Sequence, residues 1–205
     1  SHDGKRRHLL QKWLSEQATQ GVTFVGLCEL NGWHKLESLS KAKRNFPLIR
    51  TIAAEAGFSY SHVMQSSQPY NIGIISAIPF EIKAEYLPPL FQRGMLNIFF
   101  PSLLLDVFIC HLHAHSSRAR EEEAALLASI VKPIIERNEI KVLVIGDLNT
   151  LNEREQTSNG VWNDLFHQTA AEASPIIRRL KRKFCNEKNT DINYMPFRLL
   201  TDIGL

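Results

Sequence analysis

The sequence predicts a mixed α/β fold, of the α+β kind, in which two β-sheets form a sandwich flanked by helices. Three observations support this prediction. Short strand-like runs follow one another through the middle of the chain, helical segments lie before and after them, and 205 residues suffice for one layered core. Because no linker rich in Gly, Ser or Pro divides the chain, we expect residues 1–205 to form a single domain.

The composition is that of an ordinary globular protein. Hydrophobic residues make up 44% and charged residues 22%, which excludes a disordered or fibrous chain. The formal net charge of +3 is too small to identify a partner by charge alone. No run reaches the roughly 18 uninterrupted apolar residues of a membrane span. The start of the chain contains no apolar segment of the kind that signal peptides have.

The three cysteines, Cys28, Cys110 and Cys185, are odd in number and widely spaced, with no C-x-x-C pair. This pattern predicts free thiols and favours an intracellular location. A cysteine nucleophile is an alternative, although no base stands beside a particular thiol in the sequence.

The first third of the chain contains two helical segments around one strand. Residues 9–18 have apolar side chains at helical spacing, and Gly21 ends this segment. Residues 22–30 are apolar on both faces, as in a buried strand. Pro47 then begins a short helix that Gly57 closes.

Strands dominate the middle of the chain. They are expected over residues 58–64, 71–78, 80–87, 95–100 and 103–111. Ser116 or Ser117 then caps a long helix that Pro133 kinks, and residues 141–145 form the next strand. Two further helical stretches begin at Pro175 and Pro196.

Three polar clusters lie where buried strands end, and a polar side chain at such a position reaches a cleft or must be satisfied internally. The first is Glu29, whose carboxylate is a suitable ligand for a hard cation such as Mg²⁺. A helix cap or a salt-bridge partner is the alternative interpretation of this residue.

The second cluster is His111, His113 and His115, which alternate along an extended segment and so can align three imidazoles on one face. Imidazole suits Zn²⁺, and a zinc hydrolase is one hypothesis. The alternative, which we prefer, is that one histidine is functional and the others lie at the surface of a strand end.

The third cluster is Asp147 with Asn149. An ionised Asp can orient or deprotonate a nucleophile, and an Asn amide can donate to a phosphate or an oxyanion. An Asx-turn that ends the strand is the structural alternative.

Four segments resemble, in order, motifs of the endonuclease/exonuclease/phosphatase superfamily of metal-dependent phosphoesterases. They are Val-Gly-Leu-Cys-Glu-Leu at 25–30, Asn-Ile-Gly-Ile-Ile-Ser-Ala-Ile-Pro at 71–79, Val-Phe-Ile-Cys-His-Leu at 107–112 and Ile-Gly-Asp-Leu-Asn at 145–149. The resemblance implies a two-sheet sandwich with the active site at the strand ends.

The resemblance also implies roles for individual residues. Glu29 would bind Mg²⁺ or Mn²⁺, and His111 would contact the scissile phosphate. Asp147 would orient or activate the attacking water, and Asn149 would hold the phosphate or the nucleophile. Substrate-binding roles are expected for Asn71 and Arg118, with Arg120 as a further cation just past the histidine strand. For at least one of the two arginines, a solvated position at a helix start is the preferred alternative.

These roles predict a magnesium-dependent hydrolase of phosphodiester or phosphomonoester bonds, most similar to a nuclease. The family's first strand and its C-terminal Asp-His strands have no counterpart, and no Asp-His pair occurs in the sequence. We therefore expect either a domain incomplete at both ends, cut from a longer protein, or a catalytically inactive member. An inactive member would be a binding or structural subunit of a larger, RNA-containing assembly.

Basic residues gather late in the sequence, in the run Arg178, Arg179, Lys181, Arg182 and Lys183. A smaller group comprises Lys41, Lys43 and Arg44. A solvated helix face is one interpretation of the run. If the run is functional, nucleic acid is the favoured partner, because clustered Lys and Arg replace the counterions of a phosphate backbone.

Overall fold

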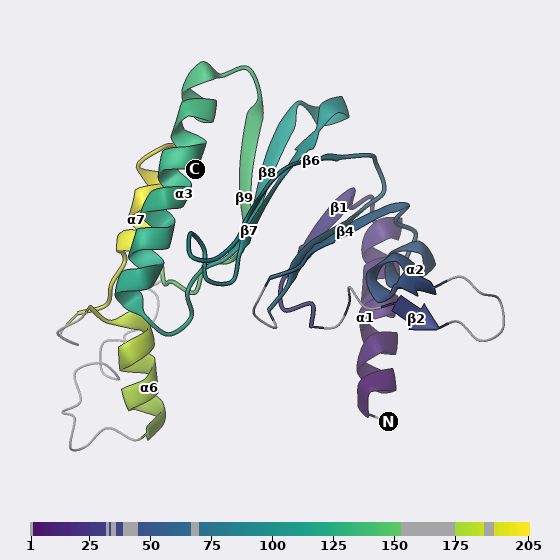
Figure 1. Cartoon of the computed structure of the whole chain (residues 1–205), viewed down its shortest axis with the longest axis horizontal. Helices are drawn as coiled ribbons and strands as arrows, with labels where there is room; N and C mark the ends of the chain where they lie inside the picture. The colour runs from purple at the N-terminus through teal and green to yellow at the C-terminus, as the bar shows by residue number, and fades with distance from the viewer. Residues whose placement is uncertain are drawn as a thin grey trace.

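The computed structural model describes residues 2–31, 33, 36–38, 45–66, 70–152, 175–186 and 191–205. These residues form four layers, in the order helices, sheet, sheet, helices (Figure 1). The predicted fold class is therefore confirmed. The smaller basic group at Lys41, Lys43 and Arg44 lies outside the described residues.

The first sheet has the strand order β1-β5-β4 and is antiparallel throughout. Its strands are β1 (Phe24–Leu27), β4 (Tyr60–Met64) and β5 (Ile72–Ser76). Helices α1 (His2–Thr19) and α2 (Leu48–Glu55) cover its outer face, where Leu14, Ile52 and Phe58 are among the buried residues. A short pair, β2 (Leu36–Ser38) and β3 (Asn45–Pro47), was not predicted from the sequence.

The second sheet has the strand order β6-β7-β8-β9, and only β8 and β9 run parallel within it. Its strands are β6 (Glu81–Tyr86), β7 (Met95–Phe100), β8 (Leu105–His111) and β9 (Lys141–Asp147). A 3-10 turn, η1 (Pro101–Leu103), joins β7 to β8. The parallel pair requires a crossover, which helix α3 (Ser117–Arg137) supplies.

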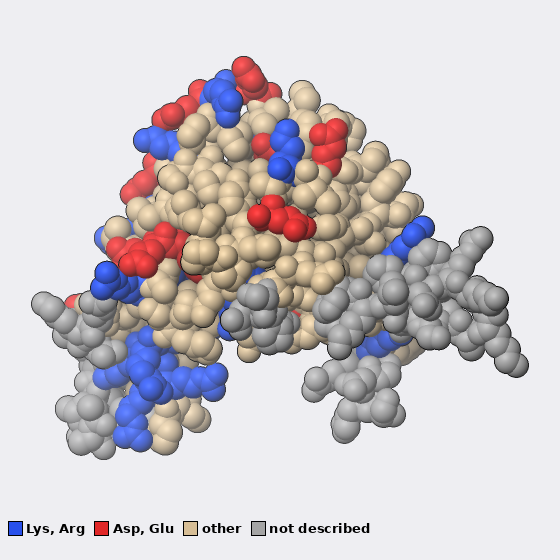
Figure 2. Space-filling view, viewed as in Figure 1, with Lys and Arg blue, Asp and Glu red and all other residues tan. Residues whose placement is uncertain are grey.

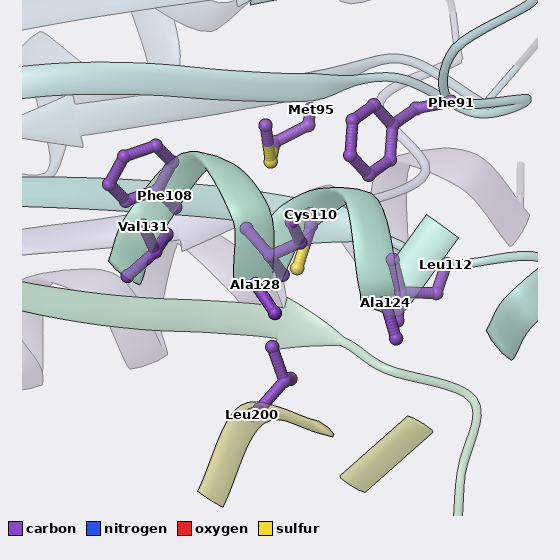
Figure 3. Packing of buried hydrophobic residues seen from close by; sticks show 10 residues of the cluster. Phe91, Met95, Phe108, Cys110, Leu112, Ala124, Ala128, Val131 and Leu200 are labelled. Atoms are coloured by element: carbon purple, nitrogen blue, oxygen red, sulfur yellow. The ribbon is translucent and has the colours of Figure 1, made fainter. Parts of the chain in front are cut away.

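Helices α3 and α7 (Met195–Thr201) cover the outer face of the second sheet. Figure 3 shows Phe108 and Cys110 of β8 against Ala124, Ala128 and Val131 of α3, with Leu200 of α7 nearby. Helix α6 (Pro175–Phe184) extends from the lower end of α3, away from both sheets (Figure 1). In the part of the chain that the structure describes, no helix is long and apolar enough to cross a membrane.

The two sheets pack face to face over an apolar core. Ile72, Ile74, Leu96, Val107 and Ile109 are fully buried there. Gly26 of β1 lies so close to β9 that a Cβ at this position would come within 2.6 Å of Ile145 Cδ1. This tight packing brings the ends of β1, β8 and β9 together at one edge of the sandwich.

Most element boundaries agree with the sequence predictions, and the differences have local causes. The strand predicted over 22–30 is shorter, because the backbone leaves the extended conformation at Glu29, where φ is 60°. The long helix begins at Ser117 because the Ser116 side chain caps it and accepts from the Ala119 amide at 3.1 Å. Pro133 lies inside that helix, as expected.

Candidate functional site

A cleft of about 590 Å³ opens at the edge where β1, β8 and β9 end. Because β8 and β9 are parallel, their carboxyl ends meet at this edge, and His111 is the register partner of Asp147. The cleft is lined by residues from six separate parts of the chain, namely Glu29, Tyr70, Arg93, Ala114, His115, Asp147, Asn149, Arg179, Arg182 and Lys183.

Glu29 presents its carboxylate to the cleft from the turn after β1. Its side chain is 58% exposed, and its backbone has a positive φ of 60°, which is uncommon and costly for a residue other than Gly. The turn is held by Asn71. Its main-chain oxygen accepts from the Leu30 amide at 2.9 Å, and its side-chain oxygen accepts from the Ser66 amide at 3.1 Å.

Asn71 is therefore a buried support behind Glu29. It lies outside the lining of the cleft, and its substrate-binding role stays a prediction.

Arg93, which the sequence analysis did not single out, lies at the centre of the site. Its guanidinium donates to Nε2 of His111, stands 3.6 Å from Oε1 of Glu29 and lies 4.1 Å above the centre of the Tyr70 ring. The side chain is only 9% exposed although it lines the cleft. A cation placed immediately before an apolar strand was the available signal, but nothing in the sequence linked it to the three polar clusters.

His111 lies beneath the cleft surface, with its side chain 1% exposed. Because a guanidinium can only donate, Nε2 is the acceptor and the proton of the neutral ring belongs on Nδ1. Burial lowers the pKa of His111, and the neighbouring Arg93 cation lowers it further, while Asp147 and Glu29 oppose both effects. The ring is therefore neutral at physiological pH.

Asp147 ends β9 and forms one turn with Asn149. The Asn149 amide donates to Oδ1 of Asp147 at 2.9 Å, so the Asx-turn expected as the alternative is present. The turn leaves the Asp147 side chain 54% exposed, with Oδ2 at 3.6 Å from Nε2 of His111. Asn149 is buried and donates from Nδ2 to the Leu112 carbonyl oxygen at 2.9 Å. The predicted catalytic trio thus meets at one place in the fold.

Gly146 allows this turn to form. Its φ is 131°, and a Cβ there would lie 1.9 Å from the Cys110 carbonyl oxygen. Only glycine fits so close to the neighbouring strand.

The three histidines of the second cluster have different surroundings. His113 uses Nδ1 to accept from the amides of His115 and Ser116, at 3.1 and 2.9 Å, at the start of α3. His115 lines the cleft, whereas His111 contacts Arg93 below it. No group of three His, Cys, Asp or Glu side chains placed to hold a metal ion occurs among the residues described, so the three imidazoles do not form one site.

Two buried charged residues of α3 connect the elements around the cleft. Glu123 accepts from the Gln92 amide at 2.8 Å and from the His113 amide at 2.6 Å. It thereby joins the segment that carries Arg93 to the segment that follows His111. Burial raises the pKa of Glu123, although both hydrogen bonds act in the opposite direction. Arg120 donates to the main-chain oxygens of His113 and Lys183.

Arg118, predicted to bind substrate, points elsewhere. Its side chain is 71% exposed, it pairs with Glu122 at 3.0 Å, and it lines a separate hollow beside α7. The structure does not bring it to the cleft, and its role stays a prediction. Burial raises the pKa of both Cys28 and Cys110 and keeps these thiols protonated, which disfavours the alternative of a cysteine nucleophile.

The donor set suits a hydrated divalent ion better than a closed protein cage. Glu29 and Asp147 both present carboxylates that are more than half exposed. Mg²⁺ retains several waters and is commonly held by one or two carboxylates. The chemistry of these two carboxylates therefore fits a hydrated Mg²⁺ or Mn²⁺ ion.

The chain has a two-sheet α/β sandwich that is covered by helices on both outer faces. A solved structure with this arrangement is that of an AP endonuclease from Archaeoglobus fulgidus, with a TM-score of 0.58 and 13% sequence identity. The match covers 97% of this chain and 66% of the endonuclease, so the chain spans slightly less than two thirds of that protein. No family model and no curated protein sequence matches the chain.

Proposed function

We propose that this chain carries the catalytic site of a metal-dependent phosphodiester hydrolase, most similar to a nuclease. The observation that carries the proposal is the convergence of Glu29, Asp147 and Asn149 around Arg93 in one cleft. The likeness in fold to an AP endonuclease supports a nuclease-like reaction. A phosphomonoester substrate is the less favoured form of the same chemistry.

The neutralisation of phosphate charge falls mainly to Arg93 in this proposal. His111 is too deeply buried to reach a substrate directly, whereas the guanidinium that it supports lines the cleft. A planar guanidinium matches two phosphate oxygens at once. His111 then acts through Arg93, by accepting from it and so fixing its orientation.

Asp147 is the group that orients the attacking water. Its exposed carboxylate accepts a proton from the water as the water oxygen bonds to phosphorus, and the bond to the leaving oxygen breaks. The leaving oxygen takes its proton from solvent. Glu29 would hold Mg²⁺ or Mn²⁺, which would supply positive charge that offsets the negative charge of the phosphate.

Hydrolysis of a fluorescently labelled oligonucleotide with and without Mg²⁺ tests this proposal. We expect Mg²⁺-dependent cleavage that falls at least about a hundredfold in Glu29→Gln and in Asp147→Asn. Glu122→Gln is the matched control, because this carboxylate lies on α3 and pairs with Arg118. Cleavage that survives both site substitutions would refute the assignment.

A second function, binding without catalysis, is favoured by one specific observation. The Arg93 guanidinium stands 3.6 Å from the Glu29 carboxylate and already supplies a positive counter-charge there. A catalytically inactive subunit of a larger, RNA-containing assembly would need no metal at this position. This second function predicts that the full-length gene product shows no turnover and co-purifies stably with its partners.

A further inference from the structure

We propose that one face of helix α6, formed by Arg179, Arg182 and Lys183, is a phosphate clamp that binds phosphates of the substrate other than the one being hydrolysed. The inference rests on the proposed function, because it assumes that the reacting phosphate binds at Arg93. It adds a substrate class, a polyanionic chain with at least two phosphates, and a separate set of residues that recognises it.

The spacing of the three residues places them on one side of the helix. Positions three and four apart share a helix face, and Arg179, Arg182 and Lys183 all line the cleft that contains Glu29 and Asp147. Arg178 and Lys181 belong to the same basic run but do not line that cleft. Figure 2 shows the resulting concentration of basic side chains over α6, at the lower left of the molecule.

Helix α6 is fixed to the site at its C-terminal end. The buried Arg120 joins the Lys183 carbonyl oxygen to that of His113, which follows the strand of His111. Asn193 donates to the Phe184 carbonyl oxygen at 2.8 Å, and its side chain donates to Ser117 Oγ at 2.7 Å. The basic face is therefore held in register with Arg93, which is what a clamp for a second phosphate needs.

The charges around the cleft are unbalanced. Among the described residues that line it, four carry cationic side chains, Arg93, Arg179, Arg182 and Lys183, and two carry carboxylates, Glu29 and Asp147. Burial lowers the pKa of Lys183, and the nearby Arg120, Arg93 and Arg179 lower it further. An anion between these side chains would relieve their mutual repulsion.

The length of the basic face exceeds what one phosphate needs. A helix rises about 1.5 Å per residue, so Arg179 and Lys183 lie about 6 Å apart along the axis. Because Arg93 lines the same cleft, the row can follow a chain of phosphates that leaves the reacting centre. A small phosphomonoester would contact only part of it.

Binding without turnover tests the clamp independently of catalysis. Fluorescence anisotropy of a labelled single-stranded oligonucleotide, in EDTA, is measured over a range of salt concentrations for the wild type and two double variants. Arg179→Gln with Arg182→Gln removes two charges from the cleft face, whereas Arg178→Gln with Lys181→Gln removes two from another face of the same helix.

We expect the cleft-face variant to lose at least about tenfold in affinity and to reduce the slope of log K against log salt by about 1.4, the value for two lost phosphate contacts on a single strand. The other variant should change affinity less than about threefold. Equal losses in both variants, or none in either, would overturn the clamp. Loss confined to the cleft face in a protein without Mg²⁺-dependent cleavage would uphold the clamp and refute the proposed catalysis.

Discussion

The Arg93 guanidinium donates to Nε2 of His111, and this contact decides how the buried histidine acts. The imidazole is held neutral with its acceptor nitrogen occupied, so it supports a cation instead of meeting the substrate itself. The family resemblance implied a direct phosphate contact for His111. The contact with Arg93 gives that part of the proposed chemistry to a residue 18 positions earlier in the chain.

Replacing Arg93 should change the titration of His111. In Arg93→Gln we expect the pKa of His111 to rise, because a neighbouring positive charge that disfavours the imidazolium is lost. NMR titration of the histidine ring protons measures this shift. Lys132→Gln, which removes a cation paired with Glu136 on the exposed side of α3, is the control and should leave the titration unchanged. A constant or lowered pKa in Arg93→Gln would contradict the arrangement.

Glu123 should be far more important for stability than its neighbour Glu122. Both oxygens of Glu123 accept main-chain amides, so Glu123→Gln sets an amide donor against another donor. We expect a loss of about 2 kcal/mol in the free energy of unfolding for Glu123→Gln. The exposed Glu122→Gln should cost less than about 0.5 kcal/mol. Urea denaturation of both variants distinguishes them, and equal losses would show that Glu123 does not join the two segments.

Gly146 should not tolerate a side chain. Gly146→Ala places a Cβ within 1.9 Å of the Cys110 carbonyl oxygen at a φ of 131°. We expect a loss of at least about 3 kcal/mol in the free energy of unfolding. Gly21→Ala has a similarly positive φ of 86° but nothing within 4 Å, and conformational strain alone should cost it about 1 kcal/mol. Thermal and urea unfolding of the pair separate steric clash from strain.

Stability should fall as the pH is lowered through the ordinary histidine pKa of 6.5. Burial lowers the pKa of both His111 and His113. In this pH range the unfolded chain therefore binds more protons than the folded chain, and acidification favours unfolding. The unfolding midpoint in urea, measured between about pH 7.5 and 5.5, should therefore decrease steadily.

The same measurement on His113→Gln provides the check. This variant lacks one of the two histidines whose pKa is lowered by folding, so its unfolding midpoint should decrease less steeply as the pH falls. Glu123 and Asp106, whose pKa values burial raises, act in the opposite sense, but nearer their ordinary values of 4.5 and 3.8. A midpoint that does not change with pH over this range, or that rises on acidification, would contradict the assigned protonation states.

The sequence by itself determined the layers of this protein and the strand-end positions of its polar residues. Apolar periodicity marks which segments must be buried, and it located the strands that carry Glu29, His111 and Asp147. The motif order predicted that these ends meet, and the parallel pairing of β8 with β9 places His111 beside Asp147.

Only the tertiary structure decided what surrounds those residues. Arg93 and the basic face of α6 are far from the three clusters in the chain, and local patterns do not encode which distant segments meet. Packing of the two sheets and the buried contacts of Arg120 and Glu123 bring them to the cleft. The same packing buries His111. Whether a side chain at a strand end binds a ligand or supports another residue therefore depends on which neighbouring elements cover it.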